Sequence, residues 1–164
     1  MTVGQMMLGE FDQEMQNTRK TLERCPDEKW NWKPHEKSGT LGWLASHVGT
    51  VPEWIAMTIK TEELDYAPVD GPSYQPPKIE NRAQLLAAFD KASAEARAAL
   101  ASVSDADMMK GWKLLAGGKE IFTMPRRMYS RHVPQPLNPP SRTAHGVFPA
   151  GRRSCSGALR AQRG

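Results

Sequence analysis

The sequence of 164 residues contains only two cysteines, Cys25 and Cys155, and they lie 130 positions apart. Two such residues provide neither a disulfide framework nor a zinc knuckle. No apolar run approaches the roughly 20 residues that span a bilayer, and the N-terminus lacks the basic and apolar segments of a secretory signal. The sequence therefore predicts a protein of the cytoplasm, with no membrane partner. A hydrophobic content of 39% is enough for one modest core.

Acidic residues are missing from the end of the chain. Residues 1–125 hold 14 Lys and Arg and all 18 Asp and Glu, a net charge of −4, whereas residues 126–164 hold eight Arg and no acid. The apparent pI of 9.2 thus comes from the last segment alone. Because the larger part is mildly acidic, it offers no basic surface for nucleic acid, and the arginines of the last segment lack the interleaved aromatic residues typical of such binding.

Residues 1–24 are expected to form the first helix, ended by Cys25-Pro26, because a residue that precedes proline is disfavoured in helical conformation. The connection over residues 26–37 carries two tryptophans and is expected to cover one end of a helical bundle. The apolar face of this first helix recurs at steps of three and four: Leu8, Phe11, Met15, Thr18 and Leu22.

A second helix is expected to begin at a cap formed by Ser38 or Thr40. Pro52 lacks a backbone N–H and is expected to kink it. Residues 62–80 hold four prolines, which predicts a long crossover instead of a tight turn. The predicted apolar face of this helix comprises Leu41, Leu44, Val48, Val51 and Ile55.

A third helix follows, because Asn81 and Gln84 resemble a capping box. The segment 112–122, with a turn at Gly117-Gly118, is compatible with a loop or a small hairpin. The apolar stripe of the third helix comprises Leu85, Phe89, Ala92, Ala96 and Leu100.

Residues 126–164 show no helical or strand period and contain five prolines and four glycines. This composition predicts an irregular tail. The sequence therefore divides into a domain at 1–125 and a tail at 126–164. Three amphipathic helices share a core that normally takes a fourth, so we expect an exposed apolar face that favours a homodimer.

His47 is the strongest candidate for a functional side chain. It lies three residues after Leu44 and four before Val51, on the side expected to face inward. A lone histidine there is more often a core residue, but neutral imidazole also binds zinc and nickel. The other histidines form no HxxxH or HExxH pair with it: His35, His132 and His145. Spacing alone therefore leaves both interpretations open.

Two other short motifs are weaker. The run around Cys155 shows nothing that would activate its thiol. Gly117-Gly118-Lys119 is too short for a phosphate-binding loop.

Several segments resemble the DinB/YfiT-like family: residues 32–38 (WKPHEKS), 41–48 (LGWLASHV), 52–54 (PEW) and 122–126 (FTMPR). The resemblance covers roughly residues 1–127. It implies a four-helix bundle that holds a divalent metal on three histidines, the first of which falls on His47. The other two form an HxxxH pair on the fourth helix in the family. Some members are metal-dependent thiol transferases or hydrolases, and many have no known substrate.

This chain has no HxxxH pair after residue 126, but its codons can contain one. Residues 134–142 (PQPLNPPSR) can be encoded so that a shift of one base reads Leu-Asn-His-Leu-Ile-His-His-Arg. The same shift over residues 153–162 permits Val-Pro-Val-Pro-Glu-Leu-Tyr-Gly-Pro-Ser, which also resembles the family. A frameshift near Met128, by mutation or sequencing error, is one explanation, and a divergent tail is the other.

The sequence thus predicts an all-α, DinB-like up-and-down helical bundle with three recognisable helices and the fourth lost. Its expected function is that of a metalloprotein with zinc or nickel bound weakly or not at all, because His47 alone survives of the ligand set. The substrate is a small molecule that the sequence does not identify. A remnant without catalysis, or a helical interaction module without metal, is the alternative. Nucleic-acid binding through the arginines of residues 126–164 is a third function, and the composition argues against it.

Overall fold

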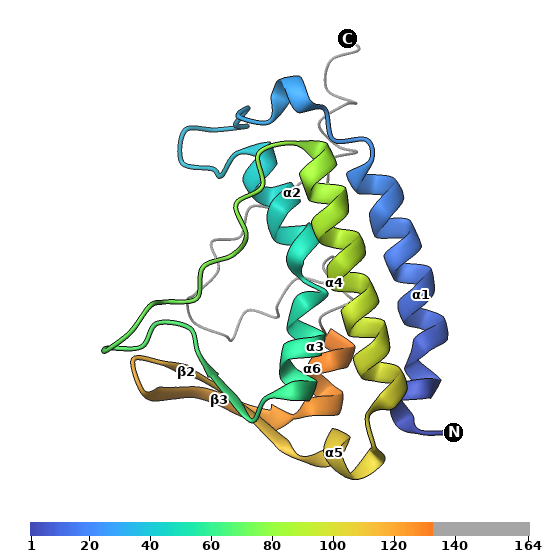
Figure 1. Cartoon of the computed structure of the whole chain (residues 1–164). Coiled ribbons are helices and arrows are strands. Elements are labelled where there is room, and N and C mark those ends of the chain that lie inside the picture. The colour runs from blue at the N-terminus through green and yellow to red at the C-terminus, as the bar shows by residue number, and fades with distance from the viewer. Residues whose placement is uncertain (133–164) are drawn as a thin grey trace.

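The computed structural model describes residues 1–132 and shows helices gathered around α4, with a small sheet at one end (Figure 1). Helix α1 runs up, α2 and α3 run down, and α4 runs down beside them (Figure 1). The elements in chain order are α1 (Val3–Leu22), η1 (Asp27–Lys29), α2 (Leu41–Thr50), α3 (Glu53–Lys60), β1 (Glu63–Asp65), α4 (Arg82–Ser102), α5 (Asp105–Met109), β2 (Gly111–Ala116), β3 (Lys119–Pro125) and α6 (Arg126–His132).

Helix α1 confirms the first predicted helix. Thr2 caps it, because its side chain accepts a hydrogen bond from the Gln5 N–H while the Gln5 side chain accepts one from the Thr2 N–H. This capping box satisfies two backbone donors that the helix itself leaves unpaired. Phe11 and Leu22 are buried, and the rest of the predicted face packs against the core at partial exposure.

Helices α2 and α3 replace the single second helix. Thr40 is the cap, as predicted, and accepts a hydrogen bond from the Trp43 N–H. Val51 and Pro52 keep right-handed helical dihedral angles, so the chain continues in the same helical sense through the break. The expected kink at Pro52 is therefore a division between two short helices.

The predicted apolar face of the second helix is confirmed at Leu41 and Ile55, which are buried in α2 and α3, and is wrong between them. Leu44, Val48 and Val51 are only half-buried. The residues that α2 buries include small ones, and Gly49 lies so near Leu85 that a Cβ atom there would come within 2.6 Å of its side chain. Small residues face α4 because they allow two helices to approach closely, and a search for large apolar residues misses them. The buried residues of α2 are Leu41, Gly42, Ala45, Gly49 and Thr50.

Helix α4 confirms the third predicted helix. The Asn81 side chain accepts a hydrogen bond from the Gln84 N–H. The Gln84 side chain reaches the N–H of Glu80, one residue before the expected one. All five residues of its predicted stripe are buried: Leu85, Phe89, Ala92, Ala96 and Leu100.

The direction of α4 differs from the up-and-down topology that we expected. The predicted crossover returns the chain to the top of the bundle, so α4 runs parallel to α2 and α3 (Figure 1). Consequently, α1 runs up, the pair α2 and α3 runs down, and α4 also runs down (Figure 1). A long connection permits this arrangement, whereas short loops impose antiparallel neighbours.

A three-stranded sheet corrects the all-α expectation. Strand β2 pairs antiparallel with β3 and parallel with β1. The predicted turn at Gly117 and Gly118 joins β2 to β3, with φ angles of 59° and 75° that only glycine adopts easily. Trp112 on β2 is fully buried, and its indole N–H donates to the Thr61 hydroxyl at 3.0 Å. The sheet is thereby attached to the end of α3.

Helix α6 corrects the expectation that the chain is irregular from residue 126. The first seven residues of the expected tail, 126–132, are helical, and the rest of that tail lies outside the described residues. Arg126 donates to the Thr61 carbonyl oxygen at 2.7 Å and is buried, so contact with α3 stabilises a helix that the local sequence does not predict. Helix α6 packs on α3, α5 and α1. The fourth bundle position is thus occupied at its lower end.

The core has two parts. One lies at the upper end around Leu22, Cys25, Ala45, Leu85 and Phe89. The other lies at the lower end and comprises Phe11, Ile55, Ala96, Leu100, Val103 and Met108. Of the helices that the structure describes, none combines the length and apolar character needed to cross a membrane.

Candidate functional site

His47 lies on α2, on a side of the helix that keeps access to solvent. Its ring stacks on Trp43, with centroids 5.8 Å apart and planes 5° from parallel. The two residues are four apart on a helix, which places their side chains one above the other. Trp43 is itself 55% exposed. The ring of His47 therefore lies parallel to Trp43 at the surface, and His47 is not a buried core residue.

Partial burial lowers the pKa of the His47 imidazole. Shielding from water disfavours the charged form of a histidine. A neutral imidazole has a lone pair on one nitrogen, which is the form that binds a metal. The electrostatics of His47 therefore favour ligation near neutral pH, although they do not require it.

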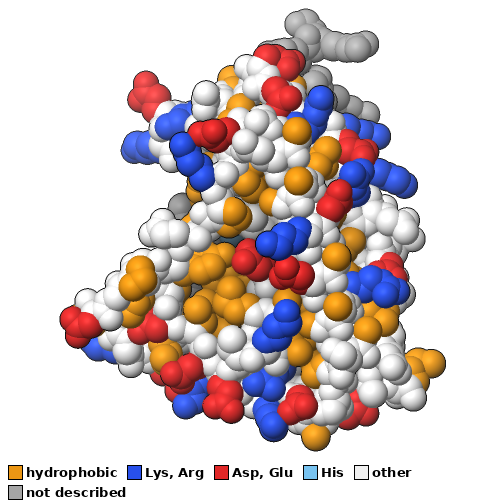
Figure 2. All heavy atoms as spheres, in the orientation of Figure 1, with side chains coloured by type: hydrophobic (Ala, Val, Ile, Leu, Met, Phe, Trp, Pro, Cys, Tyr) orange, Lys and Arg blue, Asp and Glu red, His pale blue; other side chains and the backbone are white. Residues whose placement is uncertain are grey.

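A second group lies further along the same helical face. Trp54 follows His47 by seven residues, about two helical turns, and the helical dihedral angles at Val51 and Pro52 preserve that phase. Its ring contacts Tyr74 edge to face, with centroids 5.5 Å apart. Tyr74 comes from the crossover between β1 and α4. Figure 2 shows apolar side chains gathered in a recess between the helices and the arm that carries β2 and β3.

Tyr74 also faces the carboxylate of Glu53, with its hydroxyl 3.5 Å from Oε2. Burial and the negative charge of Glu53 raise the pKa of Tyr74 to about 12. Tyr74 is therefore a neutral hydrogen-bond donor at physiological pH. The sequence analysis did not identify this residue; its one signal was an aromatic residue among the prolines of the crossover.

Of the other histidines, only His35 has a described side chain. His35 lies in the connection before α2, where its Nδ1 accepts a hydrogen bond from the Lys37 N–H. His132 is the last residue of α6, and His145 lies outside the described residues. Within residues 1–132, no three His, Cys, Asp or Glu side chains lie close enough together to hold a metal ion. The described residues thus supply one imidazole ligand and do not by themselves fit a metal.

A comparison with known protein families identifies the family of this chain. The family model of the DinB superfamily matches residues 10–124, which include α2, the crossover and the hairpin. The chain belongs to the DinB superfamily. The comparison with curated proteins yields no match, and neither does the comparison with solved structures. Membership of the DinB superfamily is consistent with the helices around α4, and the match ends two residues before α6.

Two minor candidates in this DinB-superfamily chain have structural roles. The N–H groups of Gly117 and Gly118 donate to the carboxylate of Asp65, at 3.1 Å and 2.7 Å. A carboxylate of the chain itself thus takes the backbone donors that a phosphate would need. Cys25 is completely buried in the upper core, and Cys155 lies outside the described residues.

Proposed function

We propose that this DinB-superfamily chain is a divalent-metal-binding protein, for zinc or nickel, in which His47 is a ligand. The observation that carries the proposal is the placement of His47 at the surface of α2, where its ring stacks on Trp43 and partial burial lowers its pKa. The family membership supports the same residue, because the family's first ligand falls on it. A reaction of the thiol-transferase or hydrolase class on a small molecule is the activity that this membership favours.

The ligand set of the chain as written is incomplete, and we propose that metal binding is correspondingly weak. One imidazole is fewer than the three protein ligands that a catalytic zinc site normally uses. No proton transfer or nucleophile is therefore assigned to a metal here. The proposal concerns binding through His47 alone.

The test is metal binding by the full chain, measured by calorimetry with zinc and with nickel. The His47→Ala variant is expected to reduce the weak binding to background, because it removes the ligand on α2. His35→Ala is the matched control, since His35 is exposed in the connection and is expected to leave binding unchanged. Equal losses in both variants would show nonspecific imidazole binding. One tightly bound metal per chain that survives His47→Ala would contradict the proposal.

A frameshift near Met128 is our proposal for why the ligand set is incomplete. Two observations support it. The family match ends at residue 124, and α6 begins a helix at the fourth bundle position immediately afterwards. Resequencing the coding DNA across Met124 to Arg142 tests it directly. One missed or added base should restore an HxxxH pair, whereas a DNA sequence that agrees with the protein would establish a divergent tail.

A helical interaction module is the second candidate function. Two exposed tryptophans favour it, because such residues are enriched at protein interfaces. Trp43 is 55% exposed and Trp32 is 44% exposed. Sedimentation of the full chain, with and without Trp43→Ala, tests whether this surface forms a homodimer. A monomer at all concentrations would remove the homodimer from consideration.

A further inference from the structure

The arm that carries β2 and β3 also includes β1 and residues 66–74 of the crossover. The Tyr66 N–H donates to the Leu115 carbonyl oxygen at 3.1 Å, which continues the pairing of β1 with β2. The Tyr74 N–H in turn donates to the Tyr66 carbonyl oxygen at 3.0 Å, so the loop between them closes on the sheet. The carboxylate of Asp65 accepts hydrogen bonds from backbone N–H groups of the hairpin turn at 3.1 Å and 2.7 Å. These bonds make the arm one connected unit.

The base of the arm is attached to the lower end of α3 by a buried contact. Trp112 of β2 is completely buried, and its indole N–H donates to the Thr61 hydroxyl at 3.0 Å. Where the arm joins α5 and α6, the Arg126 N–H donates to the Lys110 carbonyl oxygen at 3.0 Å. The base cannot leave α3 without exposing a whole indole ring, which costs the free energy of its apolar burial.

A second attachment lies at the opposite end of α3. The Tyr74 hydroxyl is 3.5 Å from Oε2 of Glu53, and the Tyr74 ring contacts Trp54 with centroids 5.5 Å apart. Glu53 and Trp54 are the first two residues of α3. Because the backbone of Tyr74 is bonded to the arm and its side chain contacts α3, this one residue bridges the two sides of the recess seen in Figure 2.

The two attachments differ in strength. The distance of 3.5 Å between Tyr74 and Glu53 is long for a hydrogen bond between oxygens, which is typically about 2.5–3.0 Å. Both residues are half-buried, as is Trp54, so water competes for this contact. The four residues that follow Tyr74 in the crossover are exposed and do not hold the arm to the bundle. The contact at Tyr74 is therefore the one that separates first.

We propose that the arm is a lid over the apolar recess, with the buried contact between Trp112 and Thr61 as its pivot and Tyr74 as its latch. Opening separates the Tyr74 side chain from Glu53 and Trp54 and leaves the hydrogen bonds within the arm intact. Trp54 lies on the same helical face as His47, so the open arm admits a small molecule to that face. The movement does not depend on metal binding.

Distances between two spin labels test this movement in the full chain. Lys119→Cys on the hairpin and Lys91→Cys on α4 carry the labels, because both positions are exposed and α4 packs on α3. Cys155→Ser prevents a third label, whereas Cys25 is completely buried. Tyr74→Ala should add a longer distance between the labels and raise the ratio of open to closed arms by about tenfold, because it removes the ring contact and the hydrogen bond together.

Variants on both sides of the latch separate the parts of this contact. Tyr74→Phe keeps the ring, so the ratio should rise only about twofold, and Glu53→Ala should match it by removing the acceptor. Tyr66→Phe is the matched control, since Tyr66 contributes to the arm through its backbone, and it should leave the ratio unchanged.

Unchanged label distances in a folded Tyr74→Ala chain would overturn the proposal, and so would an equal change in Tyr66→Phe. Circular dichroism establishes that each variant is folded. If Tyr74→Ala does not fold, the distances in Tyr74→Phe and Glu53→Ala decide the question, because each of these substitutions removes only one side of a half-buried contact. Distances in both that equal those of the unmodified chain would again exclude the latch.

Discussion

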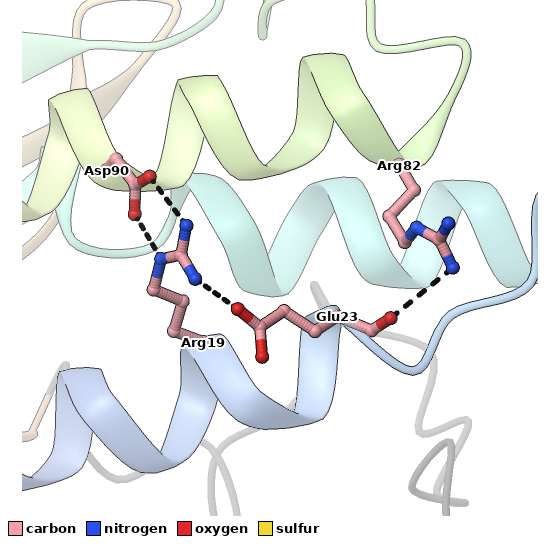
Figure 3. Close-up of polar contacts among 4 residues, drawn as sticks. All are labelled: Arg19, Glu23, Arg82 and Asp90. Carbon is pink, nitrogen blue, oxygen red and sulfur yellow. Dashed lines mark hydrogen bonds and ion pairs between the residues drawn. The ribbon is translucent and has the colours of Figure 1, made fainter.

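The two seams that flank the bundle, α1–α4 and α3–α6, differ in what lies inside them. The α1–α4 seam buries large apolar side chains such as Phe11 and Leu100, and it keeps its charged residues at the rim. There, Arg19 of α1 binds the carboxylate of Asp90 on α4 through two hydrogen bonds, at 2.8 Å and 3.1 Å (Figure 3). The α3–α6 seam instead buries polar groups, including a whole guanidinium.

This difference suggests that one contact mainly supplies the free energy of folding and the other mainly specifies how a helix docks. Burial of apolar surface is nondirectional and contributes most of the free energy of folding. Buried hydrogen bonds contribute less net free energy, but they penalise every arrangement that leaves a polar group unpaired. The α1–α4 seam therefore makes the larger contribution to stability, and the α3–α6 seam fixes how α6 docks.

The largest expected effect comes from the apolar part of α4. Phe89→Ala removes a side chain that is 1% exposed in the upper core, and it should lower the free energy of unfolding by about 3–5 kcal/mol. Denaturant unfolding measures the loss. Leu86→Ala, at a half-buried position on the same helix, is the control and should cost clearly less. Equal costs would mean that the upper core is poorly packed.

The polar seam is tested by removing its buried charge. Arg126→Met keeps most of the side-chain volume but loses the hydrogen bond to Thr61, and it should cost about 1.5–3 kcal/mol. Arg127→Met is the matched control, because Arg127 is the neighbouring exposed arginine. It should change the free energy of unfolding by less than about 0.5 kcal/mol. A larger loss in Arg127→Met would contradict the assignment of Arg126 to the seam.

Two glycines of α1 test how closely this helix approaches α4. A Cβ atom on Gly4 would lie 2.2 Å from the Leu100 carbonyl oxygen, whereas one on Gly9 would meet nothing within 4 Å. Gly4→Ala should therefore destabilise by about 1–3 kcal/mol through overpacking. Gly9→Ala should stabilise by about 0.5–1 kcal/mol, because alanine is the better helix former. Thermal unfolding of the two variants should show changes of opposite sign, and equal signs would contradict the close approach.

The sequence predicted those elements whose signals are local. The stripe from Leu85 to Leu100 repeats at helical spacing over four turns, and Asn81 marks its start, so α4 was predictable almost to the residue. The turn at Gly117 and Gly118 was predictable from two adjacent glycines, but the sequence did not decide between a loop and the hairpin that forms there. His47 was predictable as a candidate because it is the one histidine within a strongly patterned helix, but its exposure was not.

The remaining features depend on contacts between distant residues. Helix α6 forms where the chain shows no helical period, and its buried Arg126 binds Thr61, which lies 65 residues earlier. The buried residues of α2 include Gly42, Ala45 and Gly49, and a search for large apolar residues misses such small ones. Strand β1 is three residues long and depends on β2 for its pairing. No periodicity in the sequence contains this information.

The smallest expected effect concerns the charged rim of the α1–α4 seam. Arg97 binds the carboxylate of Asp12 at 2.9 Å, in the same way that Arg19 binds Asp90, and all four side chains are substantially exposed. Exposed ion pairs contribute little and are screened by salt. Asp90→Asn should therefore lower Tm slightly at low ionic strength, and the difference from the unmodified chain should vanish in 1 M salt, where the Debye length is about 3 Å.

Glu95→Gln is the matched control for that measurement, because Glu95 is an exposed carboxylate of α4 for which no ion pair is found among the described residues. It should leave Tm unchanged at both ionic strengths. If Asp90→Asn instead lowered Tm as much as Phe89→Ala, and did so in 1 M salt, the rim would hold α1 on α4 and the apolar stripe would be secondary. A small, salt-sensitive effect would instead mean that apolar burial holds the two helices together. The ion pairs between residues 12 and 97 and between residues 19 and 90 would then select the antiparallel register of α1 and α4.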